Sequence, residues 1–453
     1  MALVIEQCQV APSPGSVAEL TLPLTYFDFQ WLNFHRMRRI LFYKFPISKT
    51  TFVQTIIPSL TNSLSLTLKH YISLAGNVVC PLDLSGYPEL RYLTGDSVSV
   101  IFSESYMDFD FLVGNHPRNA KEFYPFVPQL ADAKHAPGVL LAPLLAIQVT
   151  LFPNHGISIG STHHHVAGDG ASFAGFTKAW ASLNKFGGDE QFLAKEFIPY
   201  YDRSVIKDPH GLRMSYWDVM KNIKLEICDH IVIPPHKVRA TFIITRDDIR
   251  KLKNLILSRR PNLTHVTSFT VTCAYVWTCL IKSEGATIGK EIDENEMEFF
   301  VCVADCRARF KPPIHPSYFG NCLMAYIART RHADLVGKEG FTIAVELIGE
   351  PIQKRIKDEE WILNGKWFKE FSTVNAKRLL SVAGSPKLDL YAADFGWGRP
   401  EKLEFVSIDN GDGVSMSLSK SKDSDEDLEI GLSLPKARMN VFAAIFTHGL
   451  NVL

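Results

Sequence analysis

Residues 145–170, LAIQVTLFPNHGISIGSTHHHVAGDG, decide the fold. Apolar residues alternate with polar or small ones on both sides of a turn at 153–156, which is typical of a β-hairpin. The second strand runs directly into His163, His164 and His165, and residues 173–183 predict a helix after the turn at 168–170. This segment therefore delivers a histidine from the end of a strand into a glycine-containing turn.

His165 is the candidate reactive residue of this segment. It is the only one of the fifteen histidines with an aspartate four residues on, Asp169. Turns after strands are where scaffolds present reactive groups. A neutral imidazole can take a proton from a hydroxyl and return it to a leaving thiolate. Asp169 could orient the loop or the ring, and the competing interpretation is a structural histidine that ends a strand.

A metal site is the second interpretation of the histidine run. Its ligands would be His163 and His164, with His155 and Asp169 as further candidates. Consecutive residues of a strand point to opposite faces, so His164 cannot easily join the others. The residues therefore favour a site without metal.

A second segment with unusual residues is Asp394-Phe-Gly396-Trp397-Gly398. Two glycines around a tryptophan indicate a turn that needs unusual backbone angles or close packing. Asp-Phe-Gly also opens a kinase motif, but no glycine-rich phosphate loop or His-Arg-Asp accompanies it. We exclude a kinase, and from the residues alone Asp394 caps or pairs rather than reacts.

Arg307 and Arg309 form a third candidate group, in Asp305-Cys-Arg-Ala-Arg309 after an apolar strand. Alternate arginines share one face of an extended segment, which suits them to pair a buried carboxylate or to hold phosphate. The competing interpretation is a solvated pair.

Composition limits the classes of protein. The chain has 48 basic residues (Lys and Arg) and 48 acidic residues (Asp and Glu), so its formal net charge is zero. A zero net charge argues against nucleic acid as the main partner. The eight cysteines show no paired zinc spacing and are interpreted as free thiols of a reducing compartment. No signal peptide or membrane span is evident in the sequence. We expect a cytoplasmic protein.

The chain is too long for one ordinary core, so two domains are expected. We place an N-terminal domain at 1–190, a connection with few periodic features at 191–235, and a C-terminal domain at 236–453. Helices are predicted over 49–75, 247–258, 268–282 and 436–449, and strands over 241–245, 298–304 and 403–408, with a hairpin around 420–427. Both halves mix helix and strand.

The two signature segments, His165-Val-Ala-Gly-Asp169 and Asp394-Phe-Gly-Trp-Gly398, resemble those of the BAHD acyltransferases of plant specialised metabolism. The length of the chain, the order of the two segments and their separation also fit that family. Tyr318-Phe-Gly-Asn-Cys322 is similar to a further motif of the branch that acylates anthocyanin and flavonoid glycosides. The opening residues 22–27, Trp31 and residues 38–43 also look like that branch.

The resemblance implies an α/β fold of two similar domains, each like chloramphenicol acetyltransferase, with a channel between them. His165 would be the general base, with Asp169 and Asp394 as the other residues of the catalytic set. The Asp394 loop would lie away from the reacting atoms and support the architecture, and a catalytic part for it is the alternative. Asp169 would pair with Arg307 or Arg309, and Gly396 and Gly398 would brace the second motif. The oxyanion donor would be Trp397 or a backbone amide.

The implied reaction transfers a malonyl group from malonyl-CoA to a sugar hydroxyl of a flavonoid, anthocyanin or naphthol glucoside, in a ternary complex. Malonyl-CoA is a substrate, and no permanently bound cofactor, metal or membrane partner is expected; the protein would be a monomer. Lys387 and Tyr391 are expected at the acceptor or malonyl pocket. The residues expected to contact the cofactor are Arg38, Arg39, Lys251, Lys253, Arg259, His265, Thr267 and Ser268.

Three alternatives stay open at the level of the sequence. The donor could be acetyl-CoA or a hydroxycinnamoyl-CoA instead of malonyl-CoA. A non-catalytic small-molecule binder on the same fold is a different class of function, and a metallohydrolase is another. Turnover on several donors, CoA release, and activity after chelation distinguish them.

Overall fold

The hairpin predicted at residues 145–163 forms as its alternation indicates. The computed structural model describes residues 2–84, 86–221, 231–288, 292–354, 358–371 and 373–452. Strands β10 (Leu145–Phe152) and β11 (Gly156–His163) pair antiparallel, with Leu145 opposite His163 and Phe152 opposite Gly156. Every residue of β10 is buried, so the hairpin lies inside the fold and not at its edge.

The hairpin occupies the middle of a six-stranded sheet with the order β1-β6-β10-β11-β3-β16. Strand β3 pairs antiparallel with β11 along its whole length, from Met37 opposite His163 to Lys44 opposite Gly156. The other strands of this sheet are β1 (Leu3–Val10), β6 (Val98–Glu104), β3 (Met37–Lys44) and β16 (Lys402–Phe405).

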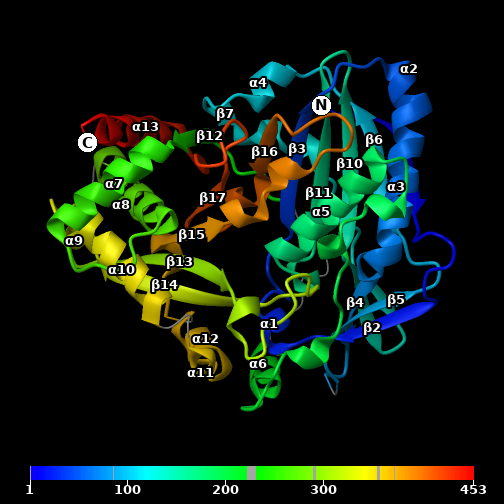
Figure 1. The fold of residues 1–453 in the computed structure, drawn as a ribbon, viewed down its shortest axis with the longest axis horizontal. Coiled ribbons are helices and arrows are strands. Elements are labelled where there is room, and N and C mark those ends of the chain that lie inside the picture. The colour runs from blue at the N-terminus through cyan, green and yellow to red at the C-terminus, as the bar shows by residue number, and fades with distance from the viewer. Residues whose placement is uncertain are drawn as a thin grey trace.

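Two long helices pack together over one face of this sheet. The expected helix at 49–75 forms as α2 (Lys49–Thr51), a π-helical turn (Phe52–Ile56), α3 (Ile57–His70) and a final 3-10 turn (Ile72–Ala75). The helix after the histidine run is α5 (Gly170–Lys185). The indole nitrogen of Trp180 on α5 donates a hydrogen bond to the Leu60 carbonyl oxygen on α3, at 3.3 Å. In Figure 1 both helices lie beside the sheet of the N-terminal half.

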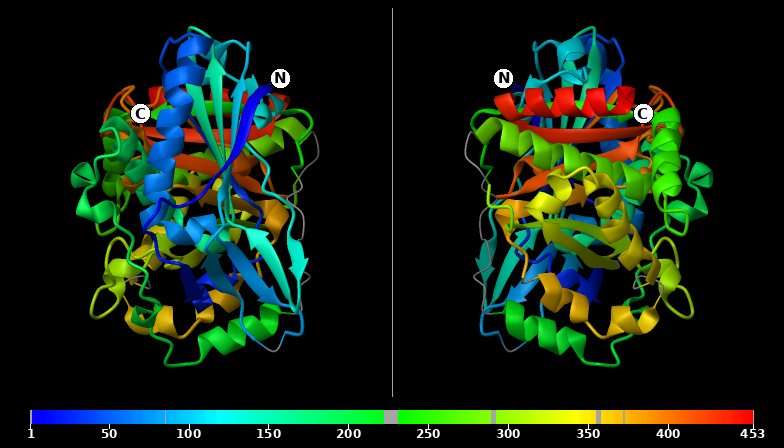
Figure 2. Two further views of the ribbon diagram at one scale, coloured as in Figure 1. Left: turned by 90° about the vertical axis from the view of Figure 1, so that its right-hand side faces the viewer. Right: turned by 90° about the vertical axis from the view of Figure 1, so that its left-hand side faces the viewer.

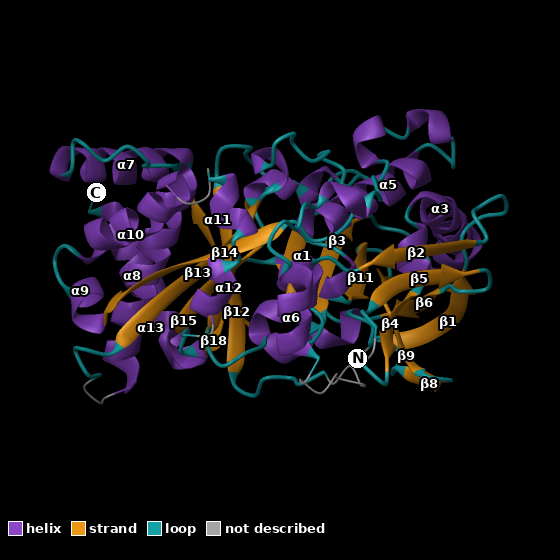
Figure 3. Ribbon diagram, turned by 90° about the horizontal axis from the view of Figure 1, so that it is seen from below, coloured by secondary structure: helices purple, strands orange, loops and turns teal. Residues whose placement is uncertain are grey.

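The C-terminal half builds a seven-stranded sheet with the order β14-β13-β15-β17-β18-β12-β7. Helices α7, α8 and α10 gather at the end of the molecule away from α3 and α5, as Figure 3 shows from below. In the right-hand view of Figure 2 the last helix, α13, crosses the face of this half. The strands are β12 (Lys237–Ile244), β13 (Met297–Asp305), β14 (Leu323–Arg331), β15 (Leu379–Ala383), β17 (Val414–Lys420), β18 (Leu428–Pro435) and β7 (Arg118–Asn119). The long helices are α7 (Arg246–Arg259), α8 (Ser268–Ile288), α10 (Gly340–Lys354) and α13 (Lys436–Asn451).

A smaller sheet and several short helices complete the fold. The sheet has the order β2-β5-β4-β9-β8, with β2 (Glu19–Pro23), β5 (Glu89–Leu93), β4 (Asn77–Pro81), β9 (Val139–Pro143) and β8 (Lys134–Ala136). The short helices are α1 (Tyr26–Phe29), α4 (Phe109–Val113), α6 (Leu212–Met220), α9 (His332–Val336), α11 (Glu359–Leu363) and α12 (Lys366–Phe371). The expected α/β class is confirmed.

Each half lends a strand to the sheet of the other. Strand β16, from the C-terminal half, pairs with β3, and β7, from the N-terminal half, pairs with β12. The expected strand at 403–408 ends early, because residues Val406–Asp409 form a 3-10 turn. The expected connection at 191–235 holds 3-10 turns and α6, and residues 222–230 of it lie outside the described residues. Strand pairing therefore crosses the expected domain boundary at 191–235 twice, once from each half of the chain.

Two observations bear on the expected surroundings of the protein. Among the residues that the structure describes, no helix combines the length and apolar character needed to cross a bilayer. The seven described cysteines are free thiols, six of them buried; Cys228 lies outside the described residues.

Candidate active site

The spacing of His165 and Asp169 follows from the way a strand turns into a helix. Strand β11 ends at His163, and residues His165–Ala167 form a single 3-10 turn. Asp169 is the N-cap of α5, where its Oδ1 accepts hydrogen bonds from the backbone amides of Ala171 (3.1 Å) and Ser172 (3.2 Å). A side-chain oxygen at this position satisfies amides that the helix cannot pair itself. The four-residue interval is the length of this turn.

The carboxylate of Asp169 faces an arginine and not the imidazole. Arg307 contacts both of its oxygens, with Nη1 2.8 Å from Oδ2 and Nη2 3.0 Å from Oδ1. The amide of Cys322 also donates to Oδ2, at 3.1 Å. Burial alone would raise the pKa of the Asp169 carboxyl, but the Arg307 guanidinium and these hydrogen bonds hold that pKa below its ordinary value. Asp169 is therefore an anion that joins the two halves of the chain.

Of the two arginines expected to brace the motif, only Arg307 does so. Its guanidinium is buried, and its Nη2 also donates to the carbonyl oxygens of Tyr318 and Gly320. Arg309 instead hydrogen-bonds the backbone carbonyl of Asp305. The bidentate geometry is the strong form of an arginine–carboxylate pair.

His165 is held by aromatic rings. Its imidazole stacks on the indole of Trp31, with ring centroids 3.9 Å apart and planes 7° apart. Phe34 meets the same imidazole edge-on at 5.7 Å. Its Nδ1 is buried without a hydrogen-bond partner among the described residues, which leaves Nε2 to meet a hydroxyl. Burial lowers the pKa of His165 to about 4, although its own backbone carbonyl, Asp169 and the Asn321 side chain oppose that shift, so the imidazole is neutral at pH 7.

Asn321 fixes the backbone that carries the base. Its Nδ2 donates to the carbonyl oxygens of His165 (3.0 Å) and Val166 (3.3 Å). The same Nδ2 donates to Oδ1 of Asp28 at 3.0 Å. Asn321 is fully buried and belongs to the Tyr318–Cys322 segment. This role was missed at the level of the sequence, where the segment signalled only the family branch.

The other histidines of the run have structural partners. His163 stacks on Phe173 at 3.5 Å, and Nδ1 of His164 accepts a hydrogen bond from the amide of Val166 at 3.3 Å. His155 lies in the exposed turn at the opposite end of β11. In the described part of the chain, no three histidine, cysteine or acidic side chains are grouped to hold a metal ion.

The second signature segment lies far from the base. Asp394 pairs with Lys185 at the carboxyl end of α5, at 2.7 Å, and its Oδ1 accepts from the amides of Gly396 and Gly398, each at 2.8 Å. Both glycines have positive φ, +96° and +87°, which other residues rarely adopt. The two glycines therefore brace the turn as expected.

Trp397 lies at the wrong end of the sheet to serve the reacting atoms. Its indole stacks on Phe45 at 5.4 Å and meets Tyr43 edge-on at 5.4 Å. Tyr43 is paired with Ile157, six residues before His163 on β11. At about 3.3 Å per strand residue, this places the segment roughly 20 Å from the base. This position agrees with the expectation that the Asp394 loop lies away from the reacting atoms and supports the architecture. The catalytic part of Asp394 and the oxyanion role of Trp397 stay predictions that this geometry does not favour.

The residues expected to contact CoA fall into two groups. Lys251, Lys253 and Arg259 project from α7, and His265, Thr267 and Ser268 lie directly before or at the start of α8. The structure brings Lys253 and Ser268 together, with Nζ 3.0 Å from Oγ. Arg259 approaches Glu339 at 3.7 Å, and Lys251 is exposed on α7. Among these residues the structure therefore shows direct contact between Lys253 and Ser268.

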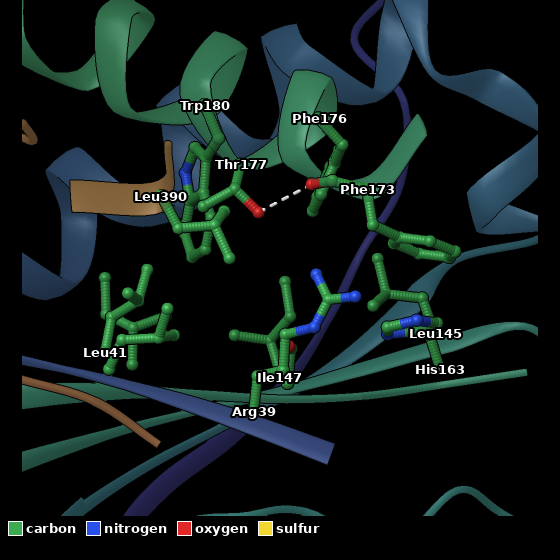
Figure 4. Close-up of a pocket in the computed structure, with 13 residues that line it drawn as sticks. Arg39, Leu41, Leu145, Ile147, His163, Phe173, Phe176, Thr177, Trp180 and Leu390 are labelled. Carbon is green, nitrogen blue, oxygen red and sulfur yellow. Dashed lines mark hydrogen bonds between the residues drawn. The ribbon is translucent and has the colours of Figure 1, made fainter. Parts of the chain in front are cut away.

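Arg38 and Arg39 lie on the opposite half of the molecule, on β3. Both are buried, and they are paired with Thr162 and Ser161 of β11. Arg39 extends from β3 toward α5 into a cavity, as Figure 4 shows. The cavity is lined by Arg39, Leu41, Leu145, Ile147, Ile159, Ser161, His163, Phe173, Phe176, Thr177, Trp180, Leu390 and Leu403.

The guanidinium of Arg39 is in a mostly apolar setting. Its Nε has no hydrogen-bond partner among the described residues, and the group lies over the ring of Phe405 at 5.3 Å. Burial lowers the pKa of Arg39 to about 10, and Asp169 opposes that shift. Arg39 in turn lowers the pKa of His165, so the two groups are within electrostatic reach of one another.

The two residues expected at the acceptor or malonyl pocket differ. Lys387 is exposed on a 3-10 turn (Pro386–Leu388), and the neighbouring Leu388 lies over Gly170 at the start of α5. Tyr391 is buried, and its hydroxyl donates to Glu429 at 2.7 Å and accepts from the amide of Leu403. These bonds hold Tyr391 within the framework of the fold, and its place at a pocket stays a prediction.

The chain matches a known protein family along almost its whole length. The model of the Transferase family matches residues 3–448. Phenolic glucoside malonyltransferase 1 of Nicotiana tabacum is 76% identical over 455 residues and is covered in full, as is this chain. A malonyl-coenzyme:anthocyanin 5-O-glucoside-6'''-O-malonyltransferase of Salvia splendens is 41% identical, over 98% of this chain and 94% of the relative.

Solved structures share the fold at low identity. Vinorine synthase matches with a TM-score of 0.70 at 18% identity, over 97% of this chain and 96% of its own. TRI101 of F. graminearum, solved with ethyl coenzyme A, matches with a TM-score of 0.67 at 14% identity, over 94% and 97%. At these identities the likeness establishes the fold alone.

Proposed function

The chain belongs to the BAHD acyltransferases, the Transferase family whose model it matches, and on that premise we propose that it transfers a malonyl group from malonyl-CoA to a sugar hydroxyl of a phenolic glucoside. The observation that carries the proposal is the placement of His165. A neutral imidazole stands at the end of β11, and the neighbouring carboxylate is fully engaged by Arg307. The full-length identity to a phenolic glucoside malonyltransferase supports the substrates.

The reaction needs one base and no covalent enzyme intermediate. Nε2 of His165 takes the proton of the sugar hydroxyl while the oxygen attacks the thioester carbonyl of malonyl-CoA. The C–S bond of the tetrahedral intermediate then breaks, and the imidazolium returns the proton to the CoA thiolate. The products are the malonyl ester and free CoA. Both substrates must be bound together, because the acyl group never rests on the protein.

The negative charge of the tetrahedral intermediate requires a donor aimed at the developing oxyanion. Because Trp397 packs at the far end of the sheet, a backbone amide near the turn at residues 165–170 is the remaining choice. The Asp394 segment supports the carboxyl end of α5 and takes no part in the chemistry.

A malonyl donor brings a free carboxylate that must be paired in a partly dry site. Arg39 suits this demand, because its guanidinium is buried, lacks a partner at Nε and is electrostatically coupled to His165. The nucleotide end of CoA is assigned to the surface of α7 and the start of α8, around Lys253 and Ser268. Arg38 and Lys387 are further cations for the donor.

Flavonoid, anthocyanin and naphthol glucosides are the acceptors to test, and the enzyme is proposed to act as a monomer in the cytoplasm. The decisive experiment measures CoA release with malonyl-CoA, acetyl-CoA and a hydroxycinnamoyl-CoA against a panel of these glucosides. We expect malonyl-CoA to give the highest kcat/KM by at least tenfold. A preference for another donor would replace the malonyl assignment, and no CoA release with any pair would favour a non-catalytic binder.

A further inference from the structure

The base of this site lacks the carboxylate that usually orients a catalytic histidine. Nδ1 of His165 has no hydrogen-bond partner among the described residues, and Asp169 is turned toward Arg307. When the imidazole takes a proton it becomes a cation in a buried place, and burial already disfavours that cation. The backbone carbonyl of His165, Asp169 and the Asn321 side chain favour the imidazolium, but burial outweighs them. A further contact that holds the ring and stabilises its charge would therefore serve the reaction.

Trp31 meets both requirements. Its indole covers one face of the His165 imidazole, at 3.9 Å and nearly parallel. Proton transfer occurs in the plane of the imidazole, at the edge that carries Nε2, so a ring on the face leaves that edge open. The face of an indole is the most favourable aromatic surface for a cation, with a contribution of about 0.5–2 kcal/mol.

The two stacked rings are tied together through one short path. The amide of Trp31 donates to the carbonyl oxygen of Asp28 at 3.0 Å. The Asp28 side chain accepts hydrogen bonds from Asn321, whose Nδ2 also donates to the carbonyl oxygen of His165 at 3.0 Å. Asp28 and Asn321 are fully buried. The stack is therefore fixed by buried hydrogen bonds on both sides.

We propose that Trp31 is a positioning residue for the general base: it holds the plane of the His165 imidazole, and its π face stabilises the imidazolium that forms during acyl transfer. The inference rests on the proposed function, because it assumes that His165 is the base. In a serine-protease triad a carboxylate orients the histidine and stabilises its imidazolium, and here the indole is proposed to do both.

The electrostatic neighbours of the base determine how the proposal is tested. The backbone carbonyl of His165, Asp169 and the Asn321 side chain favour the imidazolium, whereas burial and Arg39 oppose it. Three further imidazoles are coupled to His165, those of His35, His163 and His164. Replacing Trp31 by a small residue would admit water among all of these groups. A sharper probe changes the π face of the indole and leaves its volume nearly unchanged.

Fluorinated tryptophan supplies that probe. The full chain is produced with tryptophan replaced throughout by analogues carrying one, two or three fluorine atoms, which progressively weaken the π face. We expect kcat with malonyl-CoA and a naphthol glucoside to fall in steps, by about 2- to 30-fold in total. The acid limb of the kcat/KM profile moves to lower pH in the same order, because the protonated imidazole is destabilised.

The matched control is the same series in a Trp31→Phe background, which retains the other tryptophans. There kcat and the acid limb should not respond to fluorination. An equal response in both backgrounds, or a wild-type acid limb that stays in place as fluorine is added, overturns the role of Trp31. Failure of the proposed function is a separate result, because wild-type protein would then release no CoA from malonyl-CoA.

Discussion

Asp169 and Asp394 hold opposite ends of the same helix. Asp169 caps the amino end of α5, and Asp394 pairs with Lys185 at its carboxyl end. A helix of 16 residues is about 24 Å long. The two signature segments of the chain therefore act on one element at separate places, and only the first is near the base.

Asp394→Ala should reduce stability and leave the chemistry intact. The carboxylate of Asp394 accepts two backbone hydrogen bonds and pairs with Lys185, so its loss should cost about 1–3 kcal/mol of unfolding free energy. Thermal denaturation and kcat measure the two effects, with Lys185→Met as a companion variant. We expect kcat to stay within about threefold of the wild type. A loss of turnover above a hundredfold at unchanged Tm would instead assign the Asp394 segment a direct role in catalysis.

His165→Ala should remove most turnover and preserve binding of the donor. General-base catalysis by a positioned side chain is worth about 10²- to 10⁴-fold. Steady-state kcat and the Kd for CoA, measured by calorimetry, separate the two properties. His155→Ala is the control, because His155 is exposed in the turn at the opposite end of β11. Retained activity in His165→Ala would remove the residue from its role.

Asp169→Asn should be primarily a folding defect. It leaves the Arg307 guanidinium buried without its charge partner, at a cost of about 3–5 kcal/mol. The double variant Asp169→Asn with Arg307→Met removes both charges and should recover part of that loss. Chemical denaturation of Asp169→Asn, Arg307→Met and the double variant, each compared with the wild type, gives the coupling energy. A normal stability of Asp169→Asn beside a large loss of kcat would instead place Asp169 in direct contact with the reaction.

Activity and stability should respond to acid at different pH values. The pKa of His165 and of His35 is lowered to about 4, and that of His163 and His164 is well below 6.5, in each case mainly by burial. The unfolded chain takes up these protons near pH 6.5, whereas the folded chain does not, so stability is lost as pH falls below 6.5.

In the folded protein His165 stays neutral down to about pH 4, whereas the free energy of unfolding begins to fall already near pH 6.5. Short pH-jump assays should therefore show kcat/KM holding until pH approaches 4, while Tm declines from pH 6.5 downward. An acid limb near pH 6.5 in the pH-jump assay would mean that His165 is not desolvated in the working enzyme.

Arg39→Gln should change the choice of donor. If Arg39 pairs the malonyl carboxylate, the variant loses about 10- to 100-fold in kcat/KM for malonyl-CoA and much less for acetyl-CoA. The ratio of the two values is independent of how much protein folds. Lys178→Gln, a similar change on α5 outside the lining of the cavity, should keep the wild-type ratio. An unaltered ratio in Arg39→Gln would move the carboxylate contact to another cation.

The sequence predicts what is encoded by local periodicity. Alternation at 145–163 located the hairpin, and helical spacing located α3, α5, α7, α8 and α13 within a few residues. The alternating strand and the turn after it also placed His165 at a strand end correctly, because both features occur within one short segment. Two of these helices, α5 and α7, begin with residues of a kind that commonly caps helices, Asp169 and Thr245.

Contacts between distant segments could not be predicted in the same way. The sequence around Trp397 and Tyr391 gives no sign of their partners. Tertiary packing places Trp397 against Phe45 and pairs Tyr391 with Glu429. The partner of Asp169 was narrowed to two arginines, and the choice of Arg307 depends on the turn that follows β13. No periodicity reports that β16 and β7 pair across the halves, since strand partners lie outside any local window.

The exchanged strand β16 sets the order in which the protein can be completed during its synthesis. Strand β3 has β11 on one side and β16 on the other, so it remains an open edge until residues 402–405 leave the ribosome. An open edge with the sequence MRRILFYK is a template for pairing with another chain. Premature termination before residue 402 should therefore release nascent chains that aggregate through β3, and chaperone capture should be needed until the last tenth of the chain emerges.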